Sequence, residues 1–352
     1  MLHTRKLTEQ INGYSENITV LRFIAALCVI ISHSYHCVLN GYDLVNSYTD
    51  SQCTLGGIAV SVFFFLSGFY VTKSLEKNKS LRLFLWKRCK RVFPQLWIVV
   101  LGTVFVLGPV ITTVDLKTYF SAPLTYRYLF YMLLIPEHNL PGTFLHNPDR
   151  TVNGPLWTMP VEFACYVALA LIMAVTIVAQ KKLFKKFRRV ILDVLSLILI
   201  VAVYVYILYG MRDDFLITAV RPVVFFFAGV VIYDLREKIF LNPLVGFILL
   251  LILIALGRTP FFNIALVVIL PYCILSICLG LPDMKIRPRF FNASYEMYLI
   301  GWPIQQVLMN SLQMSSPAEN WLMAIPIDIC LGYLLYAFTE MLNSRSRRRK
   351  SL

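Results

Sequence analysis

Residues 20–39, VLRFIAALCVIISHSYHCVL, decide the fold of this chain. The stretch is apolar and has the length of about 20 residues that a helix needs to cross a bilayer. It nevertheless carries Arg22 near one end and His33 well inside it. Because an Arg at the centre of a membrane helix costs roughly 2.5–3.5 kcal/mol, such side chains usually face a protein interior or a wet cavity. We therefore expect this helix to line a cavity.

Arg22 and His33 are the first candidate site residues. They lie roughly 16 Å apart along a helix axis and project from nearly the same face, since eleven residues make about three turns. In a purely structural interpretation, Arg22 extends to the membrane surface and His33 joins a polar network. In the functional one, His33 is a general base or nucleophile and Arg22 holds an anionic cosubstrate. His36 follows one turn later, but no third ligand is nearby, so we expect no metal.

The composition is that of a multi-pass membrane protein. The 352 residues are 58% hydrophobic and have a mean hydropathy of +0.68, well above ordinary soluble domains. The first apolar helix has no small-residue cleavage site, so we expect no signal peptide. The net charge of +14 arises from basic residues in short loops. The positive-inside rule explains that pattern, so nucleic-acid binding is not expected.

The fold class predicted is an all-α bundle of about ten transmembrane helices. The expected spans lie near residues 18–39, 56–75, 93–113, 155–179, 190–210, 215–235, 240–257, 261–280, 291–312 and 321–342. The aromatic stretch 118–136 is interrupted by Pro123 and Pro136, so we expect it to lie in the interface or re-enter. The whole chain, 1–352, forms a single domain with short cytoplasmic tails at 1–17 and 343–352.

Charge asymmetry sets the expected orientation. With the N-terminus inside, 26 Lys and Arg fall in inner segments and five in outer ones. This asymmetry supports ten spans and places both termini in the cytoplasm. The eight cysteines show no metal-ligand spacing. Most are expected to pack inside spans, with a Cys37–Cys53 bridge on the outer side as an alternative.

Two further segments carry polar groups toward the inner side. Ser67 interrupts an aromatic run in the second span; it either allows close helix packing or lines the cavity. In WKRCKRVFPQLW, residues 86–97, Arg88 and Arg91 share one helical face ahead of Pro94, which ends or kinks that helix. They are ordinary inner-side charge or bind anionic lipid, or they clamp a phosphate. A nucleotide-bearing cosubstrate such as coenzyme A would need such a clamp.

The long outer segment 114–154 leads into NGPLWTMPVEFACY, residues 153–166. Glu162 falls inside the fourth span, and Trp157 lies at its outer mouth. A buried carboxyl is suited to proton transfer, although pairing with an Arg for packing is the alternative. Arg221, at a similar outer depth, is a candidate partner. Near the end, residues 292–306 add Tyr295 and further polar atoms to an otherwise apolar span.

The complete pattern resembles acyltransferase family 3, membrane enzymes that O-acylate bacterial cell-surface glycans. The resemblance extends from about residue 15 to 340. The matching motifs, in chain order, are Arg22-x10-His33, Phe64-Phe65-x-Ser67-Gly68, Arg88-x2-Arg91 before Pro94, Leu156-Trp157-x4-Glu162, Arg221-x3-Phe225-x3-Gly229 and Ser294-Tyr295-x2-Tyr298-Leu299. Many members follow the last motif with a His, where this chain has Gly301, so a role of that His is absent or filled differently here.

The resemblance implies an activity and its participants. The donor would be acyl-CoA, most often acetyl-CoA, and the acceptor a hydroxyl of a surface polysaccharide or its lipid-linked precursor. Catalysis would depend on His33, Arg22 and Glu162, and the donor would be bound by Arg88, Arg91 and Ser67. On the acceptor side the expected residues are Trp157, Asn153, Arg221 and Tyr295. The location would be the bacterial inner membrane, among membrane lipids, with the oligomeric state open.

A different class remains open from the residues themselves. A transporter or flippase for a glycan or anionic substrate would also place Arg, His and Glu inside the membrane, as a relay. Against it, no internal repeat is visible, whereas many secondary transporters contain one. A third interpretation keeps the acyl-CoA donor but takes a lipid or protein as acceptor.

Overall fold

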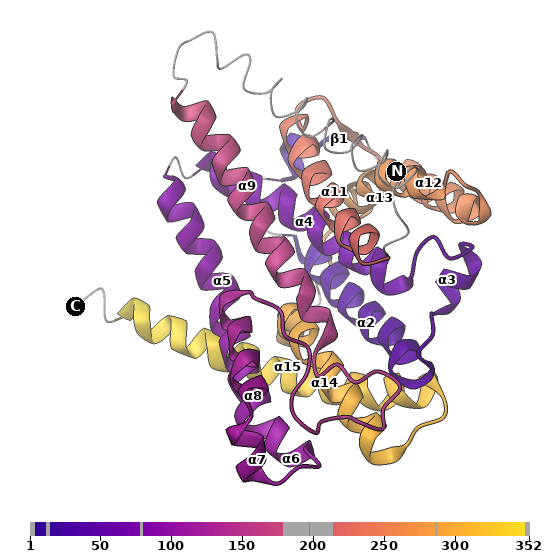
Figure 1. Ribbon diagram of the computed structural model, residues 1–352. Helices are drawn as coiled ribbons and strands as arrows, with labels where there is room; N and C mark the ends of the chain where they lie inside the picture. The colour runs from indigo at the N-terminus through magenta and orange to yellow at the C-terminus, as the bar shows by residue number, and fades with distance from the viewer. Residues whose placement is uncertain are drawn as a thin grey trace.

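The computed structural model describes residues 4–11, 15–77, 80–178, 197, 214–285 and 288–348. These residues form mostly helices (Figure 1). The longer helices are α2 (Glu16–Leu39), α4 (Leu55–Lys77), α5 (Leu81–Gly102), α9 (Thr158–Val178), α11 (Asp214–Asp234), α12 (Pro243–Ala255), α13 (Phe262–Gly280), α14 (Ser294–Leu312) and α15 (Pro317–Arg348). The short helices are α1 (Leu7–Gln10), α3 (Leu44–Tyr48), α6 (Gly108–Ile111), α7 (Leu116–Ser121) and α8 (Pro123–Arg127).

Two short strands and several short helical turns connect the helices, so the fold is not entirely α-helical as predicted. Strands β1 (Arg5–Lys6) and β2 (Phe240–Leu241) pair antiparallel, which joins the N-terminal segment to the start of α12. A π-helical turn and four 3-10 turns connect the helices: η1 (Thr103–Leu107), η2 (Tyr128–Leu133), η3 (Gly154–Trp157), η4 (Leu256–Arg258) and η5 (Arg289–Ala293).

Six helical segments of the described chain are long and apolar enough to cross a membrane. They are Glu16–Leu39, Leu55–Glu76, Leu81–Ile111, Gly154–Ala174, Phe262–Gly280 and Pro317–Leu342. A multi-pass membrane protein is thus confirmed, whereas ten spans and two cytoplasmic termini stay predictions. The expected span 190–210 lies outside the described residues. The expected span 240–257 is a shorter apolar helix that continues into a 3-10 turn.

Backbone contact between α4 and α11 forms the tightest part of the core. A Cβ added at Gly68 would lie 1.9 Å from the carbonyl oxygen of Phe226, and one at Gly229 would lie 2.3 Å from that of Phe65. Such contact is possible only without side chains, as is usual where membrane helices cross closely. Gly68 therefore provides the close helix packing that was one expectation for the Ser67-Gly68 pair. The Ser67 side chain is not part of this backbone contact.

Helix α2 contacts α4 along one side and α14 and α15 along the other. Helix α5 continues through Pro94 instead of ending there, and it begins at Leu81, well before the expected start of the third span. Arg88 and Arg91 therefore project from a helix of the bundle and not from a separate inner segment. The Cys37–Cys53 bridge, which was the alternative to cysteines packed inside spans, is not formed, since both residues are buried free thiols.

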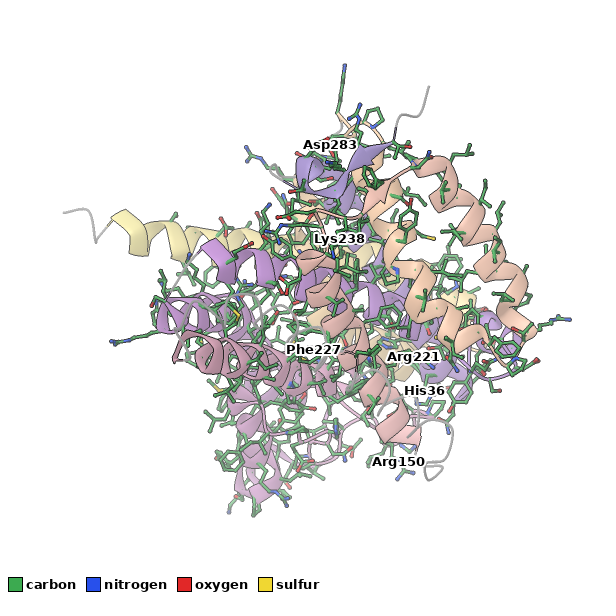
Figure 2. The ribbon with its side chains drawn as sticks, turned by 90° about the horizontal axis from the view of Figure 1, so that it is seen from above. His36, Arg150, Arg221, Phe227, Lys238 and Asp283 are labelled. Atoms are coloured by element: carbon green, nitrogen blue, oxygen red, sulfur yellow. The ribbon has the colours of Figure 1, made fainter. Side chains whose placement is uncertain are left out.

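The two ends of the bundle differ in their residues. Figure 2 separates Lys238 and Asp283 at one end from His36, Arg150 and Arg221 at the other. The first two residues lie in segments predicted on the inner side of the membrane, and the other three lie in parts of the chain predicted toward the outer side. In the outer end, the aromatic stretch 118–136 forms α7, α8 and η2, which agrees with its expected failure to form a single spanning helix.

Candidate active site

An inner cavity of about 190 Å³ lies between α2, α4, α5, α9 and α14. Arg22, Arg91, Glu162 and Tyr295 line it, so four of the predicted site residues meet there. The volume is smaller than the roughly 300–1,000 Å³ of pockets that enclose whole drug-sized ligands. It therefore suits a narrow part of a ligand and not a bulky nucleotide.

The arginines around this cavity have no acidic partner in an ion pair within the described residues. The Nε atoms of Arg22 and Arg88 are buried and donate no hydrogen bond within the described part of the chain. Arg88 does not line the cavity; its guanidinium lies 5.9 Å from the ring centroids of Phe84 and Tyr166. A buried donor without a hydrogen-bond partner is costly, so these two Nε atoms are left with unused hydrogen-bonding capacity.

Glu162 is held by two hydroxyl groups. Ser67 Oγ donates to Glu162 Oε1 over 2.9 Å, Tyr166 Oη donates to the same oxygen, and the two hydroxyls lie 2.8 Å apart. Glu162 lines the same cavity as Arg22 and Arg91, whereas His33 lines another cavity. The predicted part of Glu162 in catalysis stays a prediction. Tyr166, which the sequence reasoning missed, is one turn from Glu162, and that i, i+4 spacing was the available signal.

Tyr295 also lies on the inner side, contrary to its expected place near the acceptor. Its hydroxyl donates to the carbonyl of Val92 over 3.2 Å, which ties α14 to α5. Glu296 adds a second carboxyl to the cavity, and Gln95 Nε2 donates to it over 3.4 Å. The inner cavity thus combines two guanidinium groups with two carboxyl groups that hydroxyls and an amide hold in position.

A second, outer cavity of about 460 Å³ contains His33, Trp157 and Arg221 among its lining residues. Asp43 shapes its rim: its carboxylate accepts hydrogen bonds from the backbone of α3, from Leu55 N over 2.8 Å and from the hydroxyl of Ser32. One buried side chain therefore joins α2, α3 and α4 around the opening.

Arg221 anchors the outer loop and faces the outer cavity. Its Nη2 donates to the carbonyl of Gln52 over 2.6 Å and to Asn263 Oδ1 over 3.1 Å, and its Nη1 lies 2.9 Å from Cys53 Sγ. It makes no ion pair with Glu162 or with another described carboxylate, so the expected Arg–Glu partnership is not formed. Its positive charge remains in the outer cavity.

The His33 ring makes no hydrogen bond within the described part of the chain. Trp302 packs edge-on against it, with ring centroids 5.1 Å apart. The indole is itself fixed, because its Nε1 donates to the carbonyl of Thr151 over 2.9 Å. Packing alone therefore orients the imidazole, and both of its nitrogens remain available to a ligand.

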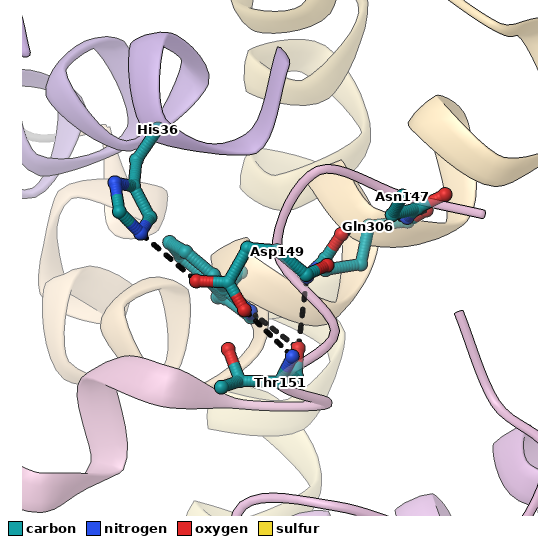
Figure 3. Close-up of polar contacts among 6 residues, drawn as sticks. His36, Asn147, Asp149, Thr151 and Gln306 are labelled. Carbon is teal, nitrogen blue, oxygen red and sulfur yellow. Dashed lines mark hydrogen bonds and ion pairs between the residues drawn. The ribbon is translucent and has the colours of Figure 1, made fainter. Parts of the chain in front are cut away.

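Residues 137–153 form a strap that is bonded to His36 of α2 and to Gln306 of α14 (Figure 3). His36 Nε2 lies 2.9 Å from Asp149 Oδ2, while Gln306 Nε2 donates to the carbonyls of Asp149 and Thr151 over 2.9 and 2.8 Å. Asn147 Nδ2 donates to Gln306 Oε1 over 2.7 Å. Burial alone would raise the pKa of Asp149, but the hydrogen bonds from His36 and Thr151 outweigh it and hold that pKa below its usual value.

Asn153 belongs to this strap and not to a cavity. It is fully buried, and its Nδ2 donates to the carbonyl of Leu299 over 2.9 Å. It ties the start of η3, which carries Trp157, to α14, and its predicted contact with the acceptor stays a prediction.

The inner and outer cavities share a wall. Val60 of α4, Thr158 of α9 and Tyr298 of α14 line both cavities. Arg22 and Glu162 thus lie on one side of this wall and His33 on the other. The sequence predicted one cavity for Arg22, His33 and Glu162, whereas the structure places them in two adjoining cavities.

The chain is similar in sequence to several known proteins. Residues 15–338 match the acyltransferase domain. An O-acetyl transferase of Shigella phage Sf6 is 27% identical over 91% of this chain and 93% of its own length. Nodulation protein 10 of Rhizobium leguminosarum bv. viciae is 26% identical over 47% of this chain and 46% of its own. The acyltransferase MdmB of Streptomyces mycarofaciens is 29% identical over 44% and 38%. No solved structure matches the chain.

Proposed function

Because the chain belongs to the acyltransferase family whose domain it matches over residues 15–338, we propose that it is a membrane O-acetyltransferase. The donor is cytoplasmic acetyl-CoA, and the acceptor is a hydroxyl of a cell-surface polysaccharide or its lipid-linked precursor. The location that follows from a cytoplasmic donor and a surface product is the bacterial inner membrane. The similarity to an O-acetyl transferase along nearly the whole chain supports acetyl as the transferred group.

The arginine cluster without ion pairs is the observation that carries this proposal. Coenzyme A is polyanionic, and guanidinium groups suit phosphate because they donate two parallel hydrogen bonds. Arg88 and Arg91 bind the phosphates, and Arg22 lines the cavity together with Arg91. Since the cavity of about 190 Å³ accommodates only a narrow group, the nucleotide stays outside and the thin pantetheine arm enters.

Glu162 has a role on the donor side under this proposal. Its Oε1 accepts hydrogen bonds from the hydroxyls of Ser67 and Tyr166, so its position is fixed in the cavity that Arg22 and Arg91 also line. There its negative charge offsets part of the positive charge of these arginines before the donor binds. Its removal should therefore affect donor binding more than the chemistry at the hydroxyl.

His33 performs the proton transfer in the outer cavity. A nitrogen that no protein group occupies takes the proton of the acceptor hydroxyl while the oxygen attacks the thioester carbonyl. The C–O bond forms, the C–S bond breaks, and the thiolate of coenzyme A leaves. Alternatively, His33 first takes the acyl group itself. The Trp157 ring in the same cavity supplies an apolar face of the kind on which a sugar ring packs.

The family membership favours this function over the transporter or flippase alternative. A transporter would release no coenzyme A. The test is the release of free coenzyme A from acetyl-CoA by the purified protein in lipid nanodiscs, with and without extracted surface polysaccharide. His33→Ala should lose acceptor-dependent release by roughly 10²–10⁴-fold, the usual contribution of a general base.

His146→Ala is the matched control, because His146 is exposed in the outer segment and lines neither cavity. It should keep wild-type activity. Coenzyme A release that is equal in the wild type and in His33→Ala would refute the assignment of His33. No release by the wild type with any glycan fraction would refute the acyltransferase proposal as a whole.

A further inference from the structure

The wall between the two cavities is a single layer of side chains. Val60, Thr158 and Tyr298 each border both the inner and the outer cavity. They come from α4, α9 and α14, three helices that are separated by long stretches of sequence. Because each of these three side chains faces both cavities, no second layer of residues lies between the cavities at this place. The shortest path between the chambers therefore passes through them.

Hydrogen bonds close this wall. The Tyr298 hydroxyl lies 2.7 Å from Thr158 Oγ1, and both hydroxyls lie within reach of the carbonyl of Pro155, at 3.1 and 3.0 Å. Phe63 packs edge-on against the Tyr298 ring, with centroids 6.1 Å apart. Three hydroxyl contacts and one ring contact hold the wall shut, and a change of side-chain rotamer would open it.

Only the acyl end of the donor needs to cross this wall. The phosphates are retained by the arginines on the inner side, and the acceptor enters the larger outer cavity that contains His33. The acyl group at the end of the thin arm must still pass from the first chamber to the second. The free width beside Val60 and Tyr298 therefore limits the size of the acyl group that reaches His33.

We propose that Tyr298 and Thr158, with Val60 beside them, form a gate that opens for the acyl group of the donor and restricts it to short chains such as acetyl. This inference rests on the proposed function and adds its chain-length selectivity. The gate also keeps water of the outer cavity away from the thioester until the acceptor has bound. Tyr298 and Thr158 act by position and opening, not by a covalent step.

The test is an acyl-length profile measured with acetyl-, butyryl- and hexanoyl-CoA on the full-length protein in nanodiscs. Val60→Ala should raise the ratio of kcat/KM for butyryl-CoA to that for acetyl-CoA at least tenfold. The Kd of coenzyme A itself should stay within twofold, because the arginines are unchanged. The control Val62→Ala, a buried position on α4 that lines neither cavity, should leave the ratio unchanged.

Removing only the hydroxyl tests the closure of the gate. Tyr298→Phe keeps the ring and should raise acceptor-independent hydrolysis of acetyl-CoA several-fold. Tyr272→Phe removes a hydroxyl of similar type, which donates to the carbonyl of Phe240 far from the wall, and should not. A merely structural role of Tyr298 would lower activity with every donor equally and leave hydrolysis without acceptor at its wild-type rate.

The failures of the two proposals are distinguishable. If the wild type turns over acetyl-CoA but Val60→Ala keeps the wild-type length profile and Tyr298→Phe shows no added hydrolysis, the gate is refuted and the acyltransferase proposal stands. If the wild type turns over no acyl-CoA, both are refuted. The gate would be established by two results together. Val60→Ala would raise the ratio of kcat/KM for butyryl-CoA to that for acetyl-CoA, and Tyr298→Phe would raise the hydrolysis of acetyl-CoA without acceptor.

Discussion

Replacing Arg22 by Met is expected to make the protein more stable and, at the same time, a poorer binder of coenzyme A. The Nε atom of Arg22 is buried without a hydrogen-bond partner, and the side chain forms no ion pair with a described residue. Leaving a buried polar group unsatisfied costs about 1–3 kcal/mol. Met has a similar length and no charge, so Arg22→Met should raise the free energy of unfolding by about that amount.

The same substitution removes a charged donor from the cavity. A hydrogen bond to a charged group contributes about 1.5–3 kcal/mol, and each 1.4 kcal/mol is a factor of about ten in affinity. The Kd of coenzyme A should therefore rise roughly ten- to hundredfold. A stability gain accompanied by a loss of binding identifies a side chain that is retained for its ligand and not for the fold.

Thermal unfolding in nanodiscs, with and without coenzyme A, measures both effects. At a ligand concentration of 100 times its Kd, the wild type should gain about 2.7 kcal/mol, whereas a variant with a hundredfold weaker Kd should gain only about 0.4 kcal/mol by the same relation. Arg82→Met, an exposed position on α5, is the control and should change neither quantity. Reduced stability of Arg22→Met with an unchanged Kd would refute the reasoning, since Arg22 would then be a structural residue.

Three further outcomes follow from individual contacts. His33→Ala should lose acyl transfer but remain in the membrane with unchanged thermal stability, because its ring makes no hydrogen bond with described residues; a matching loss in His146→Ala would contradict this. Gly68→Ala should destabilise the protein by about 3 kcal/mol or more, since the new Cβ would lie 1.9 Å from a backbone oxygen of α11. By contrast, Gly102→Ala, with no atom within 4 Å of the new Cβ, should be neutral or stabilising by roughly 0.5–1 kcal/mol; equal yields of the two variants on expression would count against the packing argument. Asp149→Asn should lower the melting temperature above about pH 4, the range above the unfolded carboxyl pKa of about 3.9, because a folded pKa below that value means that the stabilisation is lost as pH falls through it. A difference between wild type and Asp149→Asn that stays constant down to about pH 3 would rule out this linkage.

The positions of the helices follow from the sequence where long apolar runs have clear ends. The expected span 261–280 corresponds to α13 (Phe262–Gly280), and 18–39 corresponds to α2 (Glu16–Leu39). The third span was predicted to begin too late, because the basic residues before Pro94 resemble a loop. In the structure these residues continue one helix, and a proline inside it does not end it.

The neighbours of the site residues could not be predicted in the same way. Hydropathy gives the depth of Glu162 along its helix but not the direction in which the helix faces. In the structure Glu162 of α9 meets Ser67 of α4, 95 positions earlier in the chain. The contact of Thr158 with Tyr298 joins residues 140 positions apart, and no local pattern of residue types reports such a contact.

The wall of Val60, Thr158 and Tyr298 has a consequence for the cell as well as for the reaction. A bacterial inner membrane maintains an electrical potential, and each elementary charge that crosses 100 mV dissipates about 2.3 kcal/mol. An enzyme that took a donor from one face and an acceptor from the other through an open passage would discharge this potential as an ion channel does. A layer of hydrogen-bonded side chains lets such an enzyme reach both compartments while the membrane stays energised.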